Sequence, residues 1–266
     1  MIIGENILRR ILRSVALRFF CRLENDGDCN FEKNGEKRFI SALSDFFKKS
    51  KEGEIVVFDV GANVGEYSRM LLDKGGKIGL EVRIYLFEPV EGCFEILKKE
   101  FAGTEGVFLT KKAVSDRTGK AEIFYNENKS SFASLYKRNL SSYSISMDQS
   151  EPVETVRLDN YIKENTVAHI HFLKMDIEGH ELKALEGLGD YLNGDFIDFI
   201  QFEYGGANLD SHSSLMEFFD LLEKTGFKIA KVMPRGLEVR SYEPWMDNFH
   251  YANYVAISEK VIEKIS

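Results

Sequence analysis

The stretch Glu54-Ile-Val-Val-Phe-Asp-Val-Gly-Ala-Asn-Val-Gly65 decides the fold of this chain. Its first residues have the continuous apolar pattern of a buried strand, and a helical pattern begins at Gly65. A glycine-rich turn between a strand and a helix lets the backbone approach a ligand closely. The N–H groups at the start of the helix attract a negatively charged group. The stretch therefore predicts a βα unit with a ligand at the turn.

Short apolar runs then alternate with amphipathic stretches, which indicates βα units and a parallel sheet. We expect an α/β, Rossmann-like fold with helices on both faces of the sheet. Helices are expected near Gly65–Lys74, Cys93–Phe101, Glu181–Leu188 and Ser214–Thr225. Sheet strands are expected near Ile55–Asp59, Arg83–Phe87, Val107–Val114, Ile170–Asp176, Ile197–Glu203, Lys228–Val232 and Asn253–Ile257, with an extra strand at Ala121–Tyr125.

The chain divides by pattern into an N-terminal helical extension, residues 1–50, and one α/β domain, residues 51–266. Two segments interrupt the alternation of strands and helices: Asn126–Ser150, rich in serine and asparagine, and Pro234–Tyr251, which holds the only tryptophan, Trp245. Insertions of this length in a compact domain are commonly lids or binding loops. The Ser130–Ser134 loop could close over a ligand or be a surface loop.

Composition and net charge argue against several classes of protein. The 266 residues carry a net charge of −8, which argues against a general nucleic-acid binder. Three dispersed cysteines suit a reducing compartment and argue against a disulfide framework, so we expect a cytoplasmic location. No apolar run reaches the roughly 20 residues that span a bilayer. No secretory signal is recognised at the N-terminus.

The first segment, residues 1–23, has five arginines among apolar residues and predicts a basic amphipathic helix. Such a helix can attach to an anionic membrane surface, which would make the protein peripheral at the inner face of the membrane. It can equally pack on its own domain or on a second subunit. The sequence leaves the oligomeric state open.

The ligand at the turn is predicted from three strand ends. A dinucleotide fingerprint needs a second glycine where Asn63 stands, so a ligand without pyrophosphate is favoured, as in S-adenosylmethionine. Glu88 ends the second strand, where a carboxylate can accept hydrogen bonds from ribose hydroxyls. Ser115 and Asp116 follow the third strand, where adenine would lie. The expected cofactor-binding residues are Asp59, Gly61, Asn63, Gly65, Glu88, Pro89, Ser115, Asp116 and Asp176.

Four motifs resemble the FkbM-type methyltransferases: Phe58–Ser68, Phe87–Pro89, Ala113–Asp116 and Leu173–Glu181. The resemblance covers roughly Ile55 to Ser258, and its last motif is the most specific to the family. It implies a class I methyltransferase fold with a mostly parallel seven-stranded sheet and an antiparallel last strand. It also implies S-adenosylmethionine as donor and hydroxyls of sugars or secondary metabolites as acceptors, while residues 1–50 and both insertions fall outside the pattern.

Five polar residues are expected to converge beside the cofactor: Lys174, Asp176, Glu178, His180 and Glu203. A hydroxyl acceptor needs positioning and either a general base or a metal. In one mechanism Asp176, Glu178 or His180 removes the proton of the acceptor. In the other, which we do not favour, Asp176, Glu178 and Glu203 hold a divalent cation that acidifies the hydroxyl.

Other interpretations stay open. His169 and His171 alternate on one strand, and we take them as structural. The aromatic residues of the second insertion could stack on a sugar or serve packing: Tyr242, Trp245, Phe249 and His250. A non-catalytic cofactor-binding or membrane-associated partner protein is the alternative function, and Asn63 disfavours a nicotinamide dehydrogenase.

Overall fold

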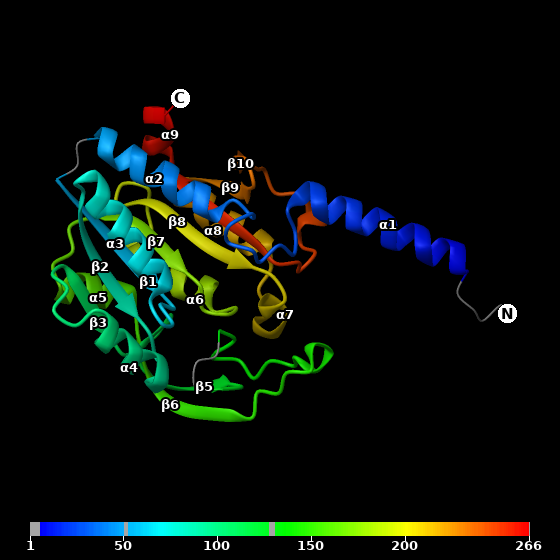
Figure 1. Cartoon of the computed structure of the whole chain (residues 1–266), viewed down its shortest axis with the longest axis horizontal. Coiled ribbons are helices and arrows are strands. Elements are labelled where there is room, and N and C mark those ends of the chain that lie inside the picture. Colours follow the sequence, from blue (N-terminus) through cyan, green and yellow to red (C-terminus); the bar gives the residue numbers. More distant parts are fainter. Residues whose placement is uncertain (1–5, 51–52, 128–130, 266) are drawn as a thin grey trace.

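The computed structural model describes residues 6–50, 53–127 and 131–265. Its main sheet has eight strands in the order β10-β9-β11-β8-β7-β1-β2-β3 (Figure 1). Neighbours from β8 to β3 pair in parallel, whereas β11 runs antiparallel to both β8 and β9. The seven strands from β9 to β3 thus have the class I methyltransferase arrangement, and β10 adds an antiparallel edge.

The elements that build the fold have the following bounds. The main-sheet strands are β1 Glu54–Val60, β2 Glu81–Phe87, β3 Val107–Thr110, β7 Ile170–Met175, β8 Ile197–Tyr204, β9 Phe227–Met233, β10 Gly236–Val239 and β11 Ala252–Ser258. A second, three-stranded sheet has β4 Ala113–Val114, β6 Gln149–Val156 and β5 Gly119–Tyr125. The helices are α1 Ile7–Glu24, α2 Glu36–Ser50, α3 Glu66–Ile78, α4 Glu91–Glu100, α5 Leu158–Glu164, α6 Glu181–Glu186, α7 Ala207–Ser211, α8 Leu215–Lys224 and α9 Glu259–Ile265.

Side chains that alternate along each strand cover both faces of the main sheet. On β1, Phe58 and Val60 pack in one core with α5, α6 and α8, whereas Ile55 and Val57 pack in the other core with α2, α3, α4 and α9. Helices therefore cover both faces, as predicted (Figure 1). Of these helices, α2 belongs to the segment expected as an extension, and it packs on the sheet through Phe39, Ile40, Leu43 and Phe47.

The single strand expected at Val107–Val114 is wrong. β3 ends at Thr110, and Ala113 and Val114 form β4, which pairs with β6 of the second sheet. The segment from Val107 to Val114 consists of two short apolar pieces, and the break between the two strands falls at Lys111 and Lys112, which separate them. The break directs the chain from one sheet to the other beside the ends of β1 and β2.

The N-terminal helix α1 projects away from the body of the molecule (Figure 1). Within the described ranges, no helix combines the length and apolar character needed to cross a bilayer.

Candidate functional site

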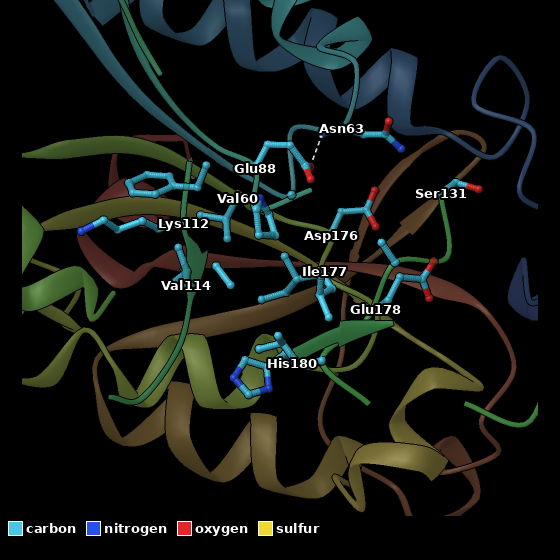
Figure 2. Close-up of a pocket in the computed structure, with 17 residues that line it drawn as sticks. Val60, Asn63, Glu88, Lys112, Val114, Ser131, Asp176, Ile177, Glu178 and His180 are labelled. Atoms are coloured by element: carbon cyan, nitrogen blue, oxygen red, sulfur yellow. Dashed lines mark hydrogen bonds between the residues drawn. The ribbon is translucent and has the colours of Figure 1, made fainter. Parts of the chain in front are cut away.

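A pocket that is partly open to solvent lies at the carboxyl ends of β1, β2 and β7 (Figure 2). This is where open α/β sheets hold their ligands. The main sheet, the β4–β5 sheet and the loop before β6 all contribute to it. Its lining is Val60, Gly61, Asn63, Phe87, Glu88, Pro89, Lys112, Ala113, Val114, Ile123, Ser131, Ala133, Leu135, Asp176, Ile177, Glu178 and His180.

Glu88 connects the ends of the first two strands. One carboxylate oxygen accepts the backbone N–H of Asn63 at 2.9 Å (Figure 2). The other accepts the N–H of Val90 at 2.8 Å. Burial raises the pKa of Glu88 to about 8, although both backbone hydrogen bonds act to lower it. Asn63 itself has a left-handed φ of 47°, a conformation that asparagine tolerates better than most residues. The carboxylate is therefore held in place at the edge of the pocket.

Two glycines of the turn are required by close approach. Gly61 has φ 83°, and a Cβ there would lie 1.9 Å from the carbonyl oxygen of Asp176. Gly65 has φ 87°, and a Cβ there would lie 2.6 Å from the ring of Phe101. Gly61 thus lets the turn meet the end of β7, while Gly65 lets α3 pack beside α4 and does not line the pocket.

Lys174 lies beneath the pocket between carboxylates from two strands. Its ammonium donates to Asp176 at 3.1 Å and lies 3.9 Å from Asp59 and 4.8 Å from the centre of the Tyr67 ring. Burial acts to lower the pKa of Lys174, but Asp176 and Asp59 together raise it above its usual value. Asp59 is fully buried and accepts the hydroxyl of Ser68. A charged Lys174 therefore stabilises Asp176, whose side chain is 34% exposed at the pocket.

Glu178 and Arg138 join the loop before β6 to the turn after β7. The Arg138 guanidinium pairs with Glu178 and lies 3.3 Å from Asp210 of α7, and the arginine side chain is only 8% exposed. Burial raises the pKa of Glu178 to about 8 against the opposing effect of Arg138. The hydroxyl of Ser134 donates to the backbone carbonyl of Glu178 at 2.8 Å. Two contacts thus fix the loop over this side of the pocket.

His180 is buried with a hydroxyl at each ring nitrogen. Ser115 lies 3.0 Å from Nε2, and Tyr136 lies 2.9 Å from Nδ1. Burial lowers the pKa of His180 to about 4, so the ring is neutral near pH 7. A neutral imidazole between two hydroxyls is well suited to hold the chain after β4 and the loop before β6 against the pocket.

Glu203 ends β8 behind the pocket and accepts the hydroxyl of Tyr251 at 2.9 Å. Burial and the nearby Asp176 raise its pKa well above the usual value. In the described ranges, groups with three ligand atoms within 4.8 Å of one another occur at two places only, Cys21–Asp26–His250 and His169–His171–Asp198. The carboxylates of Asp176, Glu178 and Glu203 do not form such a group.

The structure brings part of the predicted site to the pocket. Seven predicted residues line it: Gly61, Asn63, Glu88, Pro89, Asp176, Glu178 and His180. The other six lie outside the described lining: Asp59, Gly65, Ser115, Asp116, Lys174 and Glu203. Sequence reasoning missed Arg138 and Tyr136, which hold Glu178 and His180. Both residues lie in the serine-rich insertion, where no hydrophobic periodicity indicates which side chains are buried.

The remaining residues singled out in the sequence have local partners. Trp245 packs edge-on against Phe20, Phe249 packs against Tyr204, and the hydroxyl of Tyr242 donates to Asp247. His169 lies 3.0 Å from Asp198, and Nδ1 of His171 accepts the N–H of Val56. Ser131 and Ala133 of the Ser130–Ser134 loop line the pocket, whereas Ser130 lies outside the described residues.

Comparisons with known proteins show which family this chain resembles. The family model described as the methyltransferase FkbM domain matches residues 59–229. The 2-O-methyltransferase NoeI of Sinorhizobium fredii is 27% identical over 194 residues, 69% of this chain and 76% of the relative. The hexuronic acid methyltransferase AglP of Haloferax volcanii is 23% identical over 142 residues, 53% of each chain. A solved SAM-dependent methyltransferase from Aquifex aeolicus has a TM-score of 0.44 and 14% identity, covering 87% of this chain and 94% of its own.

Proposed function

The chain belongs to the methyltransferase FkbM domain family, and from that premise we propose that it methylates a hydroxyl of a glycan or of a small polyhydroxylated metabolite with S-adenosylmethionine as donor. The names of two relatives, a 2-O-methyltransferase and a hexuronic acid methyltransferase, support an oxygen acceptor on a sugar. The proposal includes a cytoplasmic location, which the three cysteines outside disulfides support.

The pocket has features that suit the donor. Its lining combines apolar side chains with a few polar groups that converge on one place, as in sites for small ligands and cofactors. Glu88 would accept hydrogen bonds from the ribose hydroxyls, and Gly61 and Asn63 would let the backbone approach the amino-acid part. Ile123, Leu135 and Val114 offer apolar surface for the adenine. When bound, S-adenosylmethionine supplies an electrophilic methyl group on a sulfonium.

We assign to Asp176 the role of the general base that removes the proton of the acceptor hydroxyl. His180 has a hydroxyl at each ring nitrogen, and Glu178 is paired with Arg138, whereas Asp176 is partly exposed at the pocket. Lys174 fixes one carboxylate oxygen of Asp176, and the acceptor hydroxyl would donate its hydrogen bond to that carboxylate. Asp176 would take the proton as the hydroxyl oxygen bonds to the methyl carbon, while the bond from that carbon to the sulfonium sulfur breaks and S-adenosylhomocysteine leaves.

The single observation that carries this proposal is the placement of Asp176, next to Gly61 of the cofactor turn and 3.1 Å from buried Lys174. The direct test is release of S-adenosylhomocysteine against a panel of sugars and polyhydroxylated metabolites. Asp176→Asn should lower turnover at least about a hundredfold, in the range of a general base, while calorimetry shows donor affinity largely retained.

Two outcomes would overturn the proposal. Unchanged turnover of Asp176→Asn would remove the assigned role of this carboxylate. Donor binding without turnover on any acceptor class would favour the alternative, a non-catalytic cofactor-binding protein with this fold. Exposed Glu217, which caps α8, supplies the control Glu217→Gln, because it loses a carboxylate on another element and should keep full turnover.

A further inference from the structure

The N-terminal helix α1 exposes an unusual amount of apolar surface. None of its residues from Ile7 to Glu24 is buried. The side chains of eight large apolar residues are between 52% and 67% exposed: Ile7, Leu8, Ile11, Leu12, Val15, Leu17, Phe19 and Leu23. The helix projects from the body (Figure 1). Seven of them, all except Leu17, recur at helical spacing on one side of α1, and exposed apolar surface of this extent marks a site of interaction with a protein or a membrane.

Contacts with the body fix α1 at its C-terminal end. The rings of Phe20 and Trp245 lie 5.4 Å apart, and Cys21 lies 3.2 Å from His250. Glu24, the last residue of α1, pairs with Arg240 at 3.2 Å. These contacts fix the direction in which the helix leaves the body, while the part from Ile7 to Phe19 presents its side chains outward.

The charges on α1 indicate what covers it. The helix has five arginines and one carboxylate, Glu24, although the whole chain has a net charge of −8. Arg18 and Arg22 follow Ile11 and Val15 on one helical row, at spacings of three and four residues. An interface with another protein would bury these guanidinium groups and would need a carboxylate to pair with each of them. At a lipid surface their stems can cover apolar surface while the charged groups reach the phosphates.

We propose that α1 docks on the surface of an anionic lipid bilayer. The helix lies along the interface, with its apolar residues at the boundary between headgroups and acyl chains and its guanidinium groups on lipid phosphates. The described part of the chain has no helix suited to span a bilayer, so the contact is with one leaflet.

Docking also orients the rest of the molecule. The backbone N–H of Gly27, just after α1, donates to the carbonyl of Tyr251 at 2.8 Å, and the hydroxyl of Tyr251 donates to Glu203 at 2.9 Å. Helix α1 therefore leaves the body beside the carboxyl end of β8. When α1 is docked, the side of the main sheet where β8 has its carboxyl end lies close to the bilayer, and the opposite side faces away from it.

The test is flotation of the full-length protein with phosphatidylcholine vesicles that contain or lack phosphatidylglycerol. We expect binding to the anionic vesicles, weakening with salt. The triple variant R9Q/R10Q/R13Q should bind about a hundredfold or more weakly, since each arginine near an anionic surface contributes roughly a factor of five. The matched control is K48Q/K49Q/K224Q, which removes three exposed charges elsewhere and should bind like the wild type.

A second variant, I11S/L12S, tests the apolar part of the contact and should also lose binding. Circular dichroism and thermal melting check that the body stays folded, as expected for a helix without buried residues. Equal binding to neutral and anionic vesicles, or no binding to either, would overturn the proposal. So would a dimer in sedimentation without lipid that I11S/L12S dissociates, because a second copy would then be what covers α1.

Discussion

Gly61 touches the backbone of Asp176 so closely that no other residue fits. A Cβ on Gly61 would lie 1.9 Å from the Asp176 carbonyl oxygen, and the N–H of Asp176 donates to the carbonyl of Val60 at 3.0 Å. The turn that is expected to hold the cofactor and the residue assigned to the acceptor are thus joined through the main chain. Their relative position is fixed by the sheet and not by flexible side chains.

Gly61→Ala should therefore damage stability and donor binding together. The left-handed φ of 83° costs about 1–3 kcal/mol for alanine, and the contact with Asp176 must also be relieved by a shift of the backbone. The measurement is urea unfolding with calorimetry of S-adenosylmethionine binding. The control is Gly76→Ala at an exposed position of α3, where a Cβ meets nothing within 4 Å and should stabilise the protein by roughly 0.4–1 kcal/mol. Equal changes of stability and donor affinity in Gly61→Ala and Gly76→Ala would refute the close approach of Gly61 to Asp176.

Removal of Lys174 should leave the neighbouring carboxylates of Asp59 and Asp176 without a compensating positive charge. Breaking a buried ion pair at one partner costs about 3–5 kcal/mol, because the remaining charge stays buried. Lys174→Met should therefore lower the free energy of unfolding by that order. The double variant Lys174→Met with Asp59→Asn should recover part of the loss, since fully buried Asp59 is 3.9 Å away. A strictly additive double-mutant cycle would contradict the electrostatic coupling of the two residues.

His180 predicts a definite pH dependence of stability. Its pKa falls from 6.5 to about 4 on folding, so the unfolded chain binds the extra proton between these values. The contribution of His180 is present above pH 6.5 and is lost as the pH falls towards 4, by roughly 3 kcal/mol in total. His180→Gln should remove this part of the pH dependence, measured as the difference in unfolding free energy between variant and wild type. A difference that is constant from pH 7 to about 4 would contradict the shift.

The sequence predicted the parts of this molecule that depend on local pattern. Buried strands read as apolar runs, and the turn from Asp59 to Gly65 requires glycine for reasons visible in the residues themselves. Of the second sheet only β5 was expected: β4 was joined to β3 in one predicted strand, and β6 begins inside the serine-rich insertion, where no strand was expected. Lys174 was expected on the same side of its strand as Asp176. Its contact with Asp59 could not be predicted, because Asp59 lies on the neighbouring strand. Arg138 was missed because only the fold brings it to Glu178 from 40 residues away.

Arg138 should control how firmly the loop before β6 covers the pocket. Its guanidinium holds Glu178 and Asp210, so Arg138→Met releases the loop and leaves Glu178 buried without a cation. We expect donor affinity to fall about ten- to a hundredfold, which corresponds to roughly 1.4–2.8 kcal/mol. Calorimetry measures the affinity, and proteolysis of the loop should become faster. The neighbouring Lys137→Met removes the same charge from an exposed side chain and should change neither quantity. If both variants bind the donor like the wild type, the loop is held by Ser134 and Tyr136 alone.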